Sequence, residues 1–245
     1  MDQVYSNEAE TRLRNAVAVC TRTLNHLGIL GYSGHVSARL PNADQLIVQA
    51  FDQSRAQVTP DDLMVTDFDG DVVRGPVGAE PVHEVYIHTE ILKARPDVEA
   101  VFHFHPDVAT LFTMVDGIDL QPMKNHAMRW ASGIPVHPVA AKIIDAEMGR
   151  AVAETLGGHH GMLLRSHGAV IVAENVEALM IDAIHFVENA ETMYKAAMLG
   201  PVKPLTADEM AEIGNKTNRN SHVFKLWDYY TGNALSDGAI DAEWL

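Results

Sequence analysis

The stretch EAVFHFHPDVATLF, residues 99–112, is the feature that most restricts how this chain can fold. Side chains of a β-strand alternate between the two faces of a sheet. His103 and His105 therefore point to one face, while Phe102 and Phe104 point to the other. The pattern predicts a core strand that packs two aromatic rings on one side and brings two nitrogen donors together on the other.

A metal ion that is held by protein side chains alone usually needs a third ligand. His167 in RSHGAV is the best candidate, because Gly168 beside it permits a sharp turn or a close approach of the backbone. The alternative is a set of unrelated histidines with hydrogen bonds in the core, since imidazole is intermediate in burial. Spacing alone leaves both interpretations open.

Length and charge restrict the class of protein. The chain has 245 residues and 47% hydrophobic content, which favours one large domain over residues 1–245. Its formal charge of −15, with no block of lysine or arginine, disfavours nucleic acid and anionic membranes as partners. A small polar ligand is the expected partner.

The single cysteine, Cys20, excludes an internal disulfide framework and a cysteine metal cluster. Its helical spacing from Val17 and Leu24 predicts a core residue rather than a nucleophile. The acidic, polar start MDQVYSNEAE lacks a basic and apolar leader, and no apolar run approaches membrane-spanning length. We therefore expect a cytoplasmic protein.

Periodicity and turn residues predict helices that alternate with short strands. The expected helices cover residues 8–28, 82–94, 106–115, 139–156, 176–198, 206–214 and 219–230. The expected strands are VSARL, QLIVQAF, the two arms of LMVTDFDGDVV around the Asp69-Gly70 turn, AVFHFH, IPVHPV, and two segments of GMLLRSHGAVIVAE hinged at Gly168.

Four segments, in this order and at this spacing, resemble the class II aldolase/adducin family. They are GYSGHVSARL, VTPDDLMVTDFDGDVV, PVHEVYIHTEILKARPDVEAVFHFHP and LLRSHGAVIVAENVEAL. The resemblance implies an α/β, three-layer fold in which helices flank a central, mostly antiparallel sheet. It also implies a homotetramer with active sites between subunits.

The resemblance makes His103, His105 and His167 the ligands of one divalent metal ion per subunit. Imidazole ligands suit zinc or manganese, and also iron or cobalt. Glu84 corresponds to the family's general acid or base, a role that requires a pKa raised toward neutrality. Without the resemblance, Glu84 reads as a solvated acid at the start of a helix.

The chain departs from the sugar-phosphate members of the family where those enzymes hold phosphate. They have an Asn after the first loop's glycine, a Thr-Gly pair in the next loop, and two serines before the catalytic acid. This chain has His35, the longer AFDQSRAQ and Val82-His83 instead. A phosphorylated substrate is therefore disfavoured.

A substrate carboxylate can instead be met by cationic or imidazole side chains through charge-assisted hydrogen bonds. The candidates for substrate contact are His35, His83, Arg55 and Lys124, with Tyr229 or Tyr230 as contributors from a neighbouring subunit. Arg39 is a further candidate, with a structural ion pair as the alternative interpretation.

These residues favour a metal-dependent lyase that decarboxylates a small hydroxylated carboxylic acid, aromatic or heteroaromatic, through a metal-stabilised carbanion or enolate. The first alternative is an aldolase that cleaves a hydroxy-carbonyl or sugar-phosphate-like substrate. The second is a non-catalytic, adducin-like binding module, because a fold alone does not carry a function. Retention of all three histidines and of Glu84 argues against that module.

Overall fold

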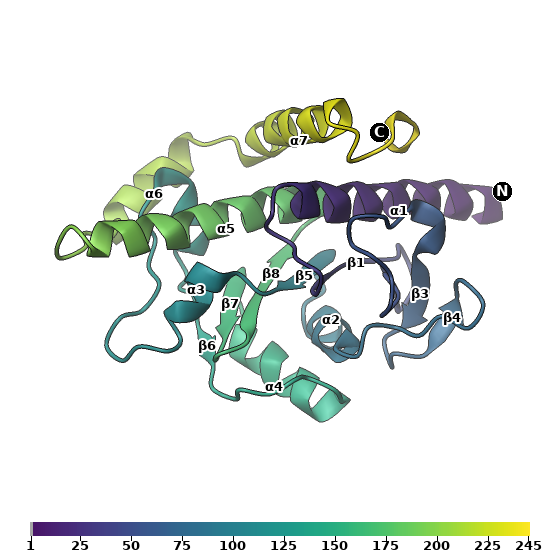
Figure 1. Ribbon diagram of the computed structural model, residues 1–245, viewed down its shortest axis with the longest axis horizontal. Coiled ribbons are helices and arrows are strands. Elements are labelled where there is room, and N and C mark those ends of the chain that lie inside the picture. The colour runs from purple at the N-terminus through teal and green to yellow at the C-terminus, as the bar shows by residue number, and fades with distance from the viewer. Residues whose placement is uncertain (1) are drawn as a thin grey trace.

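An eight-stranded sheet forms the centre of the computed structural model, which describes the backbone of residues 2–245 and the side chains of residues 8–245 (Figure 1). The strands lie in the order β4-β3-β2-β1-β5-β8-β7-β6. Neighbours are antiparallel except for β6 and β7, so the predicted mostly antiparallel sheet is confirmed. The strands are β1 (His35–Arg39), β2 (Gln45–Val48), β3 (Met64–Asp67), β4 (Val72–Arg74), β5 (Ala100–Phe104), β6 (Val136–His137), β7 (Gly161–Leu164) and β8 (Gly168–Ala173).

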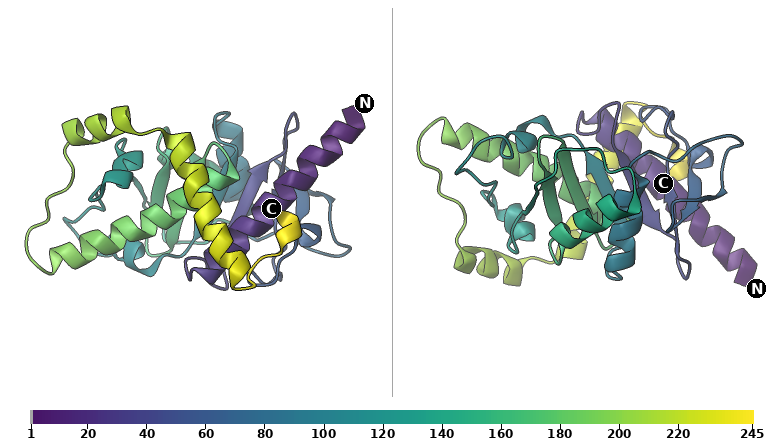
Figure 2. Two further views of the ribbon diagram at one scale, coloured as in Figure 1. Left: turned by 90° about the horizontal axis from the view of Figure 1, so that it is seen from above. Right: turned by 90° about the horizontal axis from the view of Figure 1, so that it is seen from below.

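Helices cover both faces of the sheet and complete the predicted three layers. The long helices α1, α5 and α7 contact one another on one face, and α2 packs against α4 on the other (Figure 2). The helices are α1 (Asp2–His26), α2 (Val85–Ala94), α3 (Asp107–Leu111), α4 (Ala146–Leu156), α5 (Val176–Ala197), α6 (Ala207–Lys216) and α7 (Arg219–Ser236). Short 3-10 helices lie at Pro60–Asp62, Asn125–Trp130 and Ala242–Trp244.

Strand β5 alternates as predicted. Phe102 and Phe104 stack with ring centroids 4.3 Å apart and join the core under α1 and α5, which also buries Cys20. Val101 faces the second core, between the sheet and helices α2 and α4. His103 shares the face of Val101 because the two residues are two positions apart. The strand thus separates an aromatic core from a polar site.

The predicted helix over residues 139–156 is wrong at its start. Helix α4 begins only at Ala146, where Asp145 caps it by accepting a hydrogen bond from the Met148 amide at 2.8 Å. The preceding segment is irregular because the Ile143 amide donates to Glu84 at 3.0 Å instead of joining a helix. A tertiary contact has overridden local helix propensity here.

Other predicted boundaries shift by a few residues. Helix α2 begins at Val85 rather than at residue 82, and the helix after Pro106 ends at Leu111. Strand β5 ends at Phe104, which leaves His105 just beyond it.

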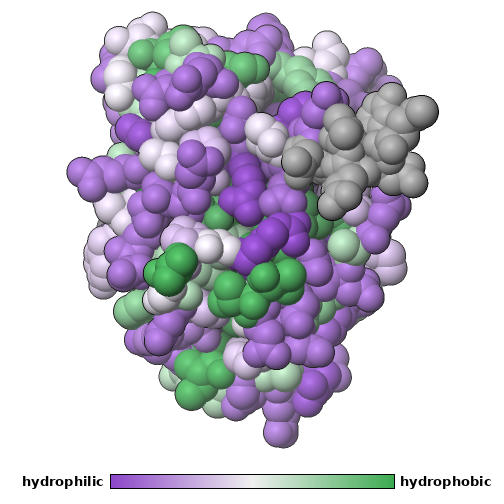
Figure 3. All heavy atoms as spheres, turned by 90° about the vertical axis from the view of Figure 1, so that its right-hand side faces the viewer, coloured by the Kyte–Doolittle hydropathy of each residue, from purple (hydrophilic) through white to green (hydrophobic). Residues whose placement is uncertain are grey.

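The surface seen from the right of Figure 1 is mainly hydrophilic, with a few hydrophobic patches (Figure 3). Within the described residues, none of the helices combines the length and the apolar character that crossing a bilayer requires.

Candidate metal centre

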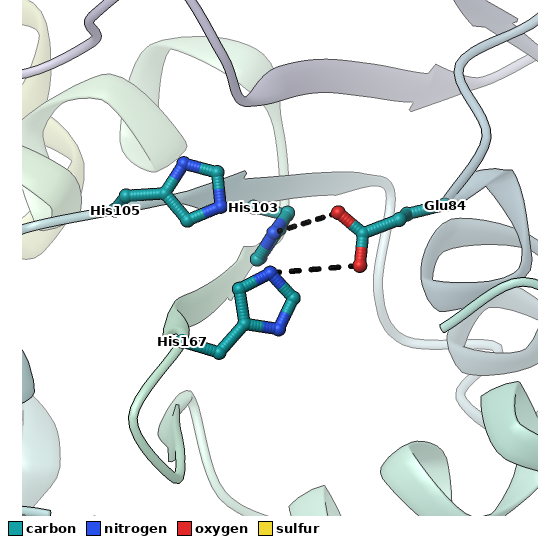
Figure 4. Close-up of side chains that lie close together, drawn as sticks. All are labelled: Glu84, His103, His105 and His167. Atoms are coloured by element: carbon teal, nitrogen blue, oxygen red, sulfur yellow. Dashed lines mark ion pairs between the residues drawn. The ribbon is translucent and has the colours of Figure 1, made fainter. Parts of the chain in front are cut away.

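Four side chains from three segments of the chain meet at one point beside the sheet (Figure 4). β5 carries His103, and His105 follows it, while His167 lies in the turn between β7 and β8. Glu84 is the N-cap residue of α2. Each residue offers one potential ligand atom, and these four atoms all lie within 4.8 Å of one another. One metal ion can bridge atoms at this spacing. The structure therefore brings together the three predicted ligands and the predicted acid.

Close backbone approach explains the glycine after His167. A Cβ atom on Gly168 would lie 2.3 Å from the Phe104 carbonyl oxygen and 3.0 Å from the His105 ring. Ser166 on the other side of His167 has a φ of 54°, an uncommon conformation for a residue with a side chain. This tight turn holds His167 against the end of β5.

A hydrogen bond to the backbone fixes the orientation of the His103 ring. Its Nδ1 lies 3.0 Å from the Ala169 carbonyl oxygen, which can only accept, so Nδ1 carries the proton. Nε2 then presents a lone pair toward the centre, and it is buried without a hydrogen-bond partner among the described residues. A buried, unpartnered lone pair beside two further imidazoles fits a divalent metal ion well.

His105 is also suited to bind a metal. Burial, together with the neighbouring imidazoles of His103 and His167, lowers the pKa of His105 to about 4. The ring is therefore neutral at physiological pH, as ligation requires.

Glu84 faces the histidines rather than solvent. Its carboxylate oxygens lie 3.5 Å from Nε2 of His103 and 3.6 Å from Nε2 of His167 (Figure 4). Burial alone would raise the pKa of Glu84, but in the metal-free site hydrogen bonds from these histidines, when their Nε2 atoms carry protons, outweigh it and hold the pKa well below its usual range. The expected raised pKa is thus not found, and Glu84 begins as a carboxylate that can accept a proton.

A cavity of about 590 Å³ opens beside the four residues. It brings together three of the predicted substrate residues, His35, Arg55 and His83. Tyr32 and Phe51 add aromatic surface, and the complete lining is Tyr32, Ser33, His35, Phe51, Arg55, Val82, His83, Glu84, His105, Ala140, Ala141, Lys142, Ser166 and His167.

The loop AFDQSRAQ supplies two parts of this lining. Phe51 stacks on His83 with ring centroids 4.0 Å apart. Arg55 is buried, and its Nε donates to the Gly34 carbonyl oxygen at 3.0 Å, while Nη1 contacts the carbonyls of Phe51 and Gln53. Nη2 has no hydrogen-bond partner among the described residues, so only this nitrogen is free for a substrate oxygen.

Three other predicted contacts do not lie at this cavity within one chain. Lys124 pairs with Glu188 at 3.2 Å, and Tyr229 is 60% exposed on α7. Arg39 donates to the carbonyls of Leu92, Arg95 and Val98 at the end of α2, which supports its structural interpretation. Within the single chain, Lys124 lies outside the lining of the cavity.

Sequence reasoning missed two groups of residues. Lys142 and Tyr32 line the cavity, although Lys142 lies in the stretch that was expected to be helical. His88, four residues after Glu84, shares its face of α2 and is completely buried against His35. The spacing of four residues was the available signal for His88.

Comparison with known proteins places this geometry in a family. The family model described as "Class II Aldolase and Adducin N-terminal domain" matches residues 15–194. The chain is 28% identical over 225 residues to 3,4-dihydroxyphthalate decarboxylase from Arthrobacter keyseri, covering 87% of this chain and 90% of that protein. It is also 28% identical over 206 residues to a 5-methylthioribulose-1-phosphate/5-deoxyribulose-1-phosphate aldolase from Rhodospirillum rubrum, covering 83% and 90%.

A solved structure has the same fold. An aldolase II superfamily protein from Pseudomonas syringae superposes with a TM-score of 0.82 at 21% identity, and the match covers 94% of this chain and 95% of that one. The matched region of the family model contains Glu84 and all three histidines. The chain belongs to the class II aldolase and adducin N-terminal domain family.

Proposed function

We propose that the protein is a metal-dependent decarboxylase of a small hydroxylated carboxylic acid with an aromatic or heteroaromatic ring. The observation that carries this proposal is the wall of the cavity beside the metal centre. There Phe51 and His83 form a flat stacked pair, and His35 and the Nη2 atom of Arg55 add hydrogen-bonding groups. Such a wall suits a planar ring that carries anionic oxygens.

The metal ligands in this proposal are His103, His105 and His167. When bound, a divalent ion supplies Lewis-acid stabilisation of negative charge on substrate oxygens. Zinc and manganese are our first candidates, with iron and cobalt as alternatives, since imidazole suits all of them.

Glu84 moves the proton in the proposed reaction. Its carboxylate first accepts the proton of the substrate hydroxyl group. The bond between the ring and the carboxylate then breaks, carbon dioxide leaves, and the electron pair stays on the ring carbon. Glu84 returns its proton to that carbon, so the product carries hydrogen where the substrate carried the carboxylate.

Aldol cleavage is the second candidate, because the relatives include an aldolase as well as decarboxylases. The decarboxylase and the aldolase are each 28% identical to this chain. What favours decarboxylation is the replacement of the expected phosphate-binding residues by His35, the AFDQSRAQ loop and Val82-His83. An aldolase of this family would use the same metal ligands and Glu84 on an unphosphorylated hydroxy-carbonyl compound.

We further propose a homotetramer in which α7 of one subunit reaches the cavity of another. Tyr229 supports this proposal because its side chain is 60% exposed and lies on a helix away from the cavity of its own chain. Sedimentation equilibrium of the metal-loaded protein measures the assembly, and a monomer would contradict it.

The decisive experiment is a substrate panel with the protein loaded separately with zinc, manganese, iron and cobalt. The panel contains hydroxylated aromatic mono- and dicarboxylates and, in parallel, sugar phosphates and unphosphorylated hydroxy-carbonyl compounds. Carbon dioxide and aldehyde are both measured. Release of carbon dioxide without aldehyde supports the decarboxylase, whereas aldehyde from a sugar compound would replace it with the aldolase.

A further inference from the structure

A buried chain of three polar side chains leads away from the cavity. Ser37 Oγ lies 2.6 Å from Nδ1 of His88, and Nε2 of His88 lies 2.6 Å from Nδ1 of His35. Ser37 and His88 are 0% exposed and His35 is 5% exposed. Of the three, only His35 lines the cavity.

Strand β1 and helix α2 fix the positions of these three hydrogen-bonded side chains. Ser37 and His35 are two residues apart on β1 and share a face of the sheet. His88 lies four residues after Glu84, so one face of α2 directs Glu84 to the metal ligands and His88 to His35. Helix α2 therefore positions both Glu84 beside the metal ligands and His88 beside His35.

Two directions of hydrogen bonding are conceivable along such a chain. In the first, Ser37 donates to His88, His88 donates to His35, and Nε2 of His35 carries a proton. In the second, each bond is reversed, and Nε2 of His35 is left with a lone pair. The two directions give His35 opposite roles toward a ligand, as a donor or as an acceptor.

The hydroxyl of Ser37 distinguishes these directions. Within the described part of the chain, His88 Nδ1 is the sole hydrogen-bond partner of Ser37 Oγ. In the reversed direction the hydroxyl proton of Ser37 would be buried without an acceptor, which costs more than an unused lone pair. The first direction satisfies every donor in the chain.

We propose that Ser37 and His88 are positioning residues that hold the His35 proton on Nε2, and that His35 thereby donates a hydrogen bond to a carboxylate of the substrate. This inference rests on the proposed function for its ligand class, while the arrangement of protons rests on the hydrogen bonds alone. His35 lies beside the metal ligand His103, with ring centroids 5.2 Å apart. A ligand at the metal centre is therefore within reach of the His35 ring.

The arrangement of protons is tested directly by nitrogen-15 NMR of the full-length protein labelled at histidine, with the metal bound. The His35 signals are identified by their loss in His35→Gln. We expect Nε2 of His35 to be protonated and Nδ1 to accept a hydrogen bond. A proton on Nδ1 would overturn the proposal, whatever the substrate is.

Binding tests the role toward the substrate, with catechol and 3,4-dihydroxybenzoate as probes that differ only in a carboxylate. The ratio of their dissociation constants reports the contribution of the carboxylate. Ser37→Ala should reduce this ratio by about three- to tenfold, the usual range for one hydrogen bond. Ser37→Thr keeps the hydroxyl group and should keep the ratio.

The outcomes distinguish the positioning role of Ser37 and His88 from the proposed substrate class. An unchanged ratio of dissociation constants in a folded, metal-loaded Ser37→Ala variant contradicts the role of the Ser37–His88–His35 hydrogen bonds in substrate binding. If neither probe binds the wild-type protein, the proposed substrate class fails, and the NMR measurement still decides the arrangement of protons. If Ser37→Ala does not fold, the NMR measurement and the comparison of wild type with Ser37→Thr remain decisive, since a changed ratio in that variant contradicts the proposal.

Discussion

His35 and His103 are directly paired residues in the antiparallel ladder between β1 and β5. Paired residues on neighbouring strands point to the same face of a sheet, so the register itself places a cavity residue beside a proposed metal ligand. Their ring centroids are 5.2 Å apart. Because a shift of one residue would turn either side chain to the opposite face, the register of β1 against β5 is a requirement of the site.

Replacing any one of the three histidines with alanine should remove the metal ion and abolish turnover while largely preserving the fold. His103, His105 and His167 each contribute one nitrogen, and two remaining imidazoles are too few to hold the ion firmly. Elemental analysis after dialysis measures the loss. His26→Ala, on the exposed end of α1, serves as the control and should retain the ion. Stoichiometric metal in all three variants would disprove the ligand assignment.

Glu84→Gln should retain the metal ion but lose roughly 100-fold or more in turnover, the scale of general acid-base catalysis. The three histidines still bind the ion, whereas the amide accepts no proton. Glu154→Gln, at an exposed position on α4, is the matched control and should have normal activity. Elemental analysis and turnover are measured on the same samples, and an undiminished rate in the metal-loaded Glu84→Gln variant would remove Glu84 from the mechanism.

Much of the fold was predictable because its signals are local. Alternation in AVFHFH placed the two phenylalanines in the core, and the Asp69-Gly70 turn marked the hairpin of β3 and β4. The three candidate ligands and Glu84 follow from the family resemblance, and the structure brings them together. His-x-His by itself did not distinguish a metal site from buried histidines.

The rest of the site depends on contacts that are distant in sequence. The segment before α4 has helix-forming residues, yet the amide of Ile143 is needed to hold the carboxylate of Glu84. That bond spans 59 residues and leaves no trace in local periodicity. Likewise, the sequence predicts Arg55 as a substrate contact, but most of its donors contact backbone carbonyls that only the folded loop places nearby.

Gly168→Ala should destabilise the protein by about 1–3 kcal/mol, the usual cost of overpacking, and should weaken metal binding. The added Cβ would lie 2.3 Å from the Phe104 carbonyl oxygen, so the turn that carries His167 must move. Gly158→Ala is the control, because nothing lies within 4 Å of a Cβ at that position. Urea unfolding and metal content are measured for both variants. Equal stability of the two would contradict the close approach at Gly168.

An ion-pair network that joins two arginines to two carboxylates should make the free energy of unfolding depend on pH. Arg219 contacts Glu174 at 2.6 Å and Asp182 at 2.7 Å, and Arg129 contacts Asp182 at 2.9 Å. Burial alone would raise the pKa of Glu174, but the hydrogen bond from Arg219 outweighs it and lowers the pKa to about 2. Folding thus favours the ionised carboxylate.

The contribution of Glu174 should therefore be complete above its ordinary pKa of 4.5 and be lost as the pH falls toward about 2. Glu174→Gln should be less stable than the wild type near neutral pH, and the difference should shrink in acid. Urea unfolding at several pH values measures it, with Glu154→Gln as the control. A difference that is constant with pH would show that the ion pairs do not depend on ionised Glu174.

Restoring serines at Val82 and His83 should weaken activity on the native substrate without removing the metal ion. Val82 and His83 line the cavity, and His83 stacks on Phe51, so the double replacement removes half of the flat wall. Neither residue belongs to the four-residue metal cluster, and the ion should remain.

In the wild type, inorganic phosphate and sugar phosphates should compete poorly, whereas hydroxy-aromatic dicarboxylates should inhibit or react. The measurement is a competition assay at fixed ionic strength that compares a pentose phosphate with an unphosphorylated hydroxy-carboxylate, since screening affects all anions. Tight binding and cleavage of the sugar phosphate by the wild type would contradict the decarboxylase and support the aldolase.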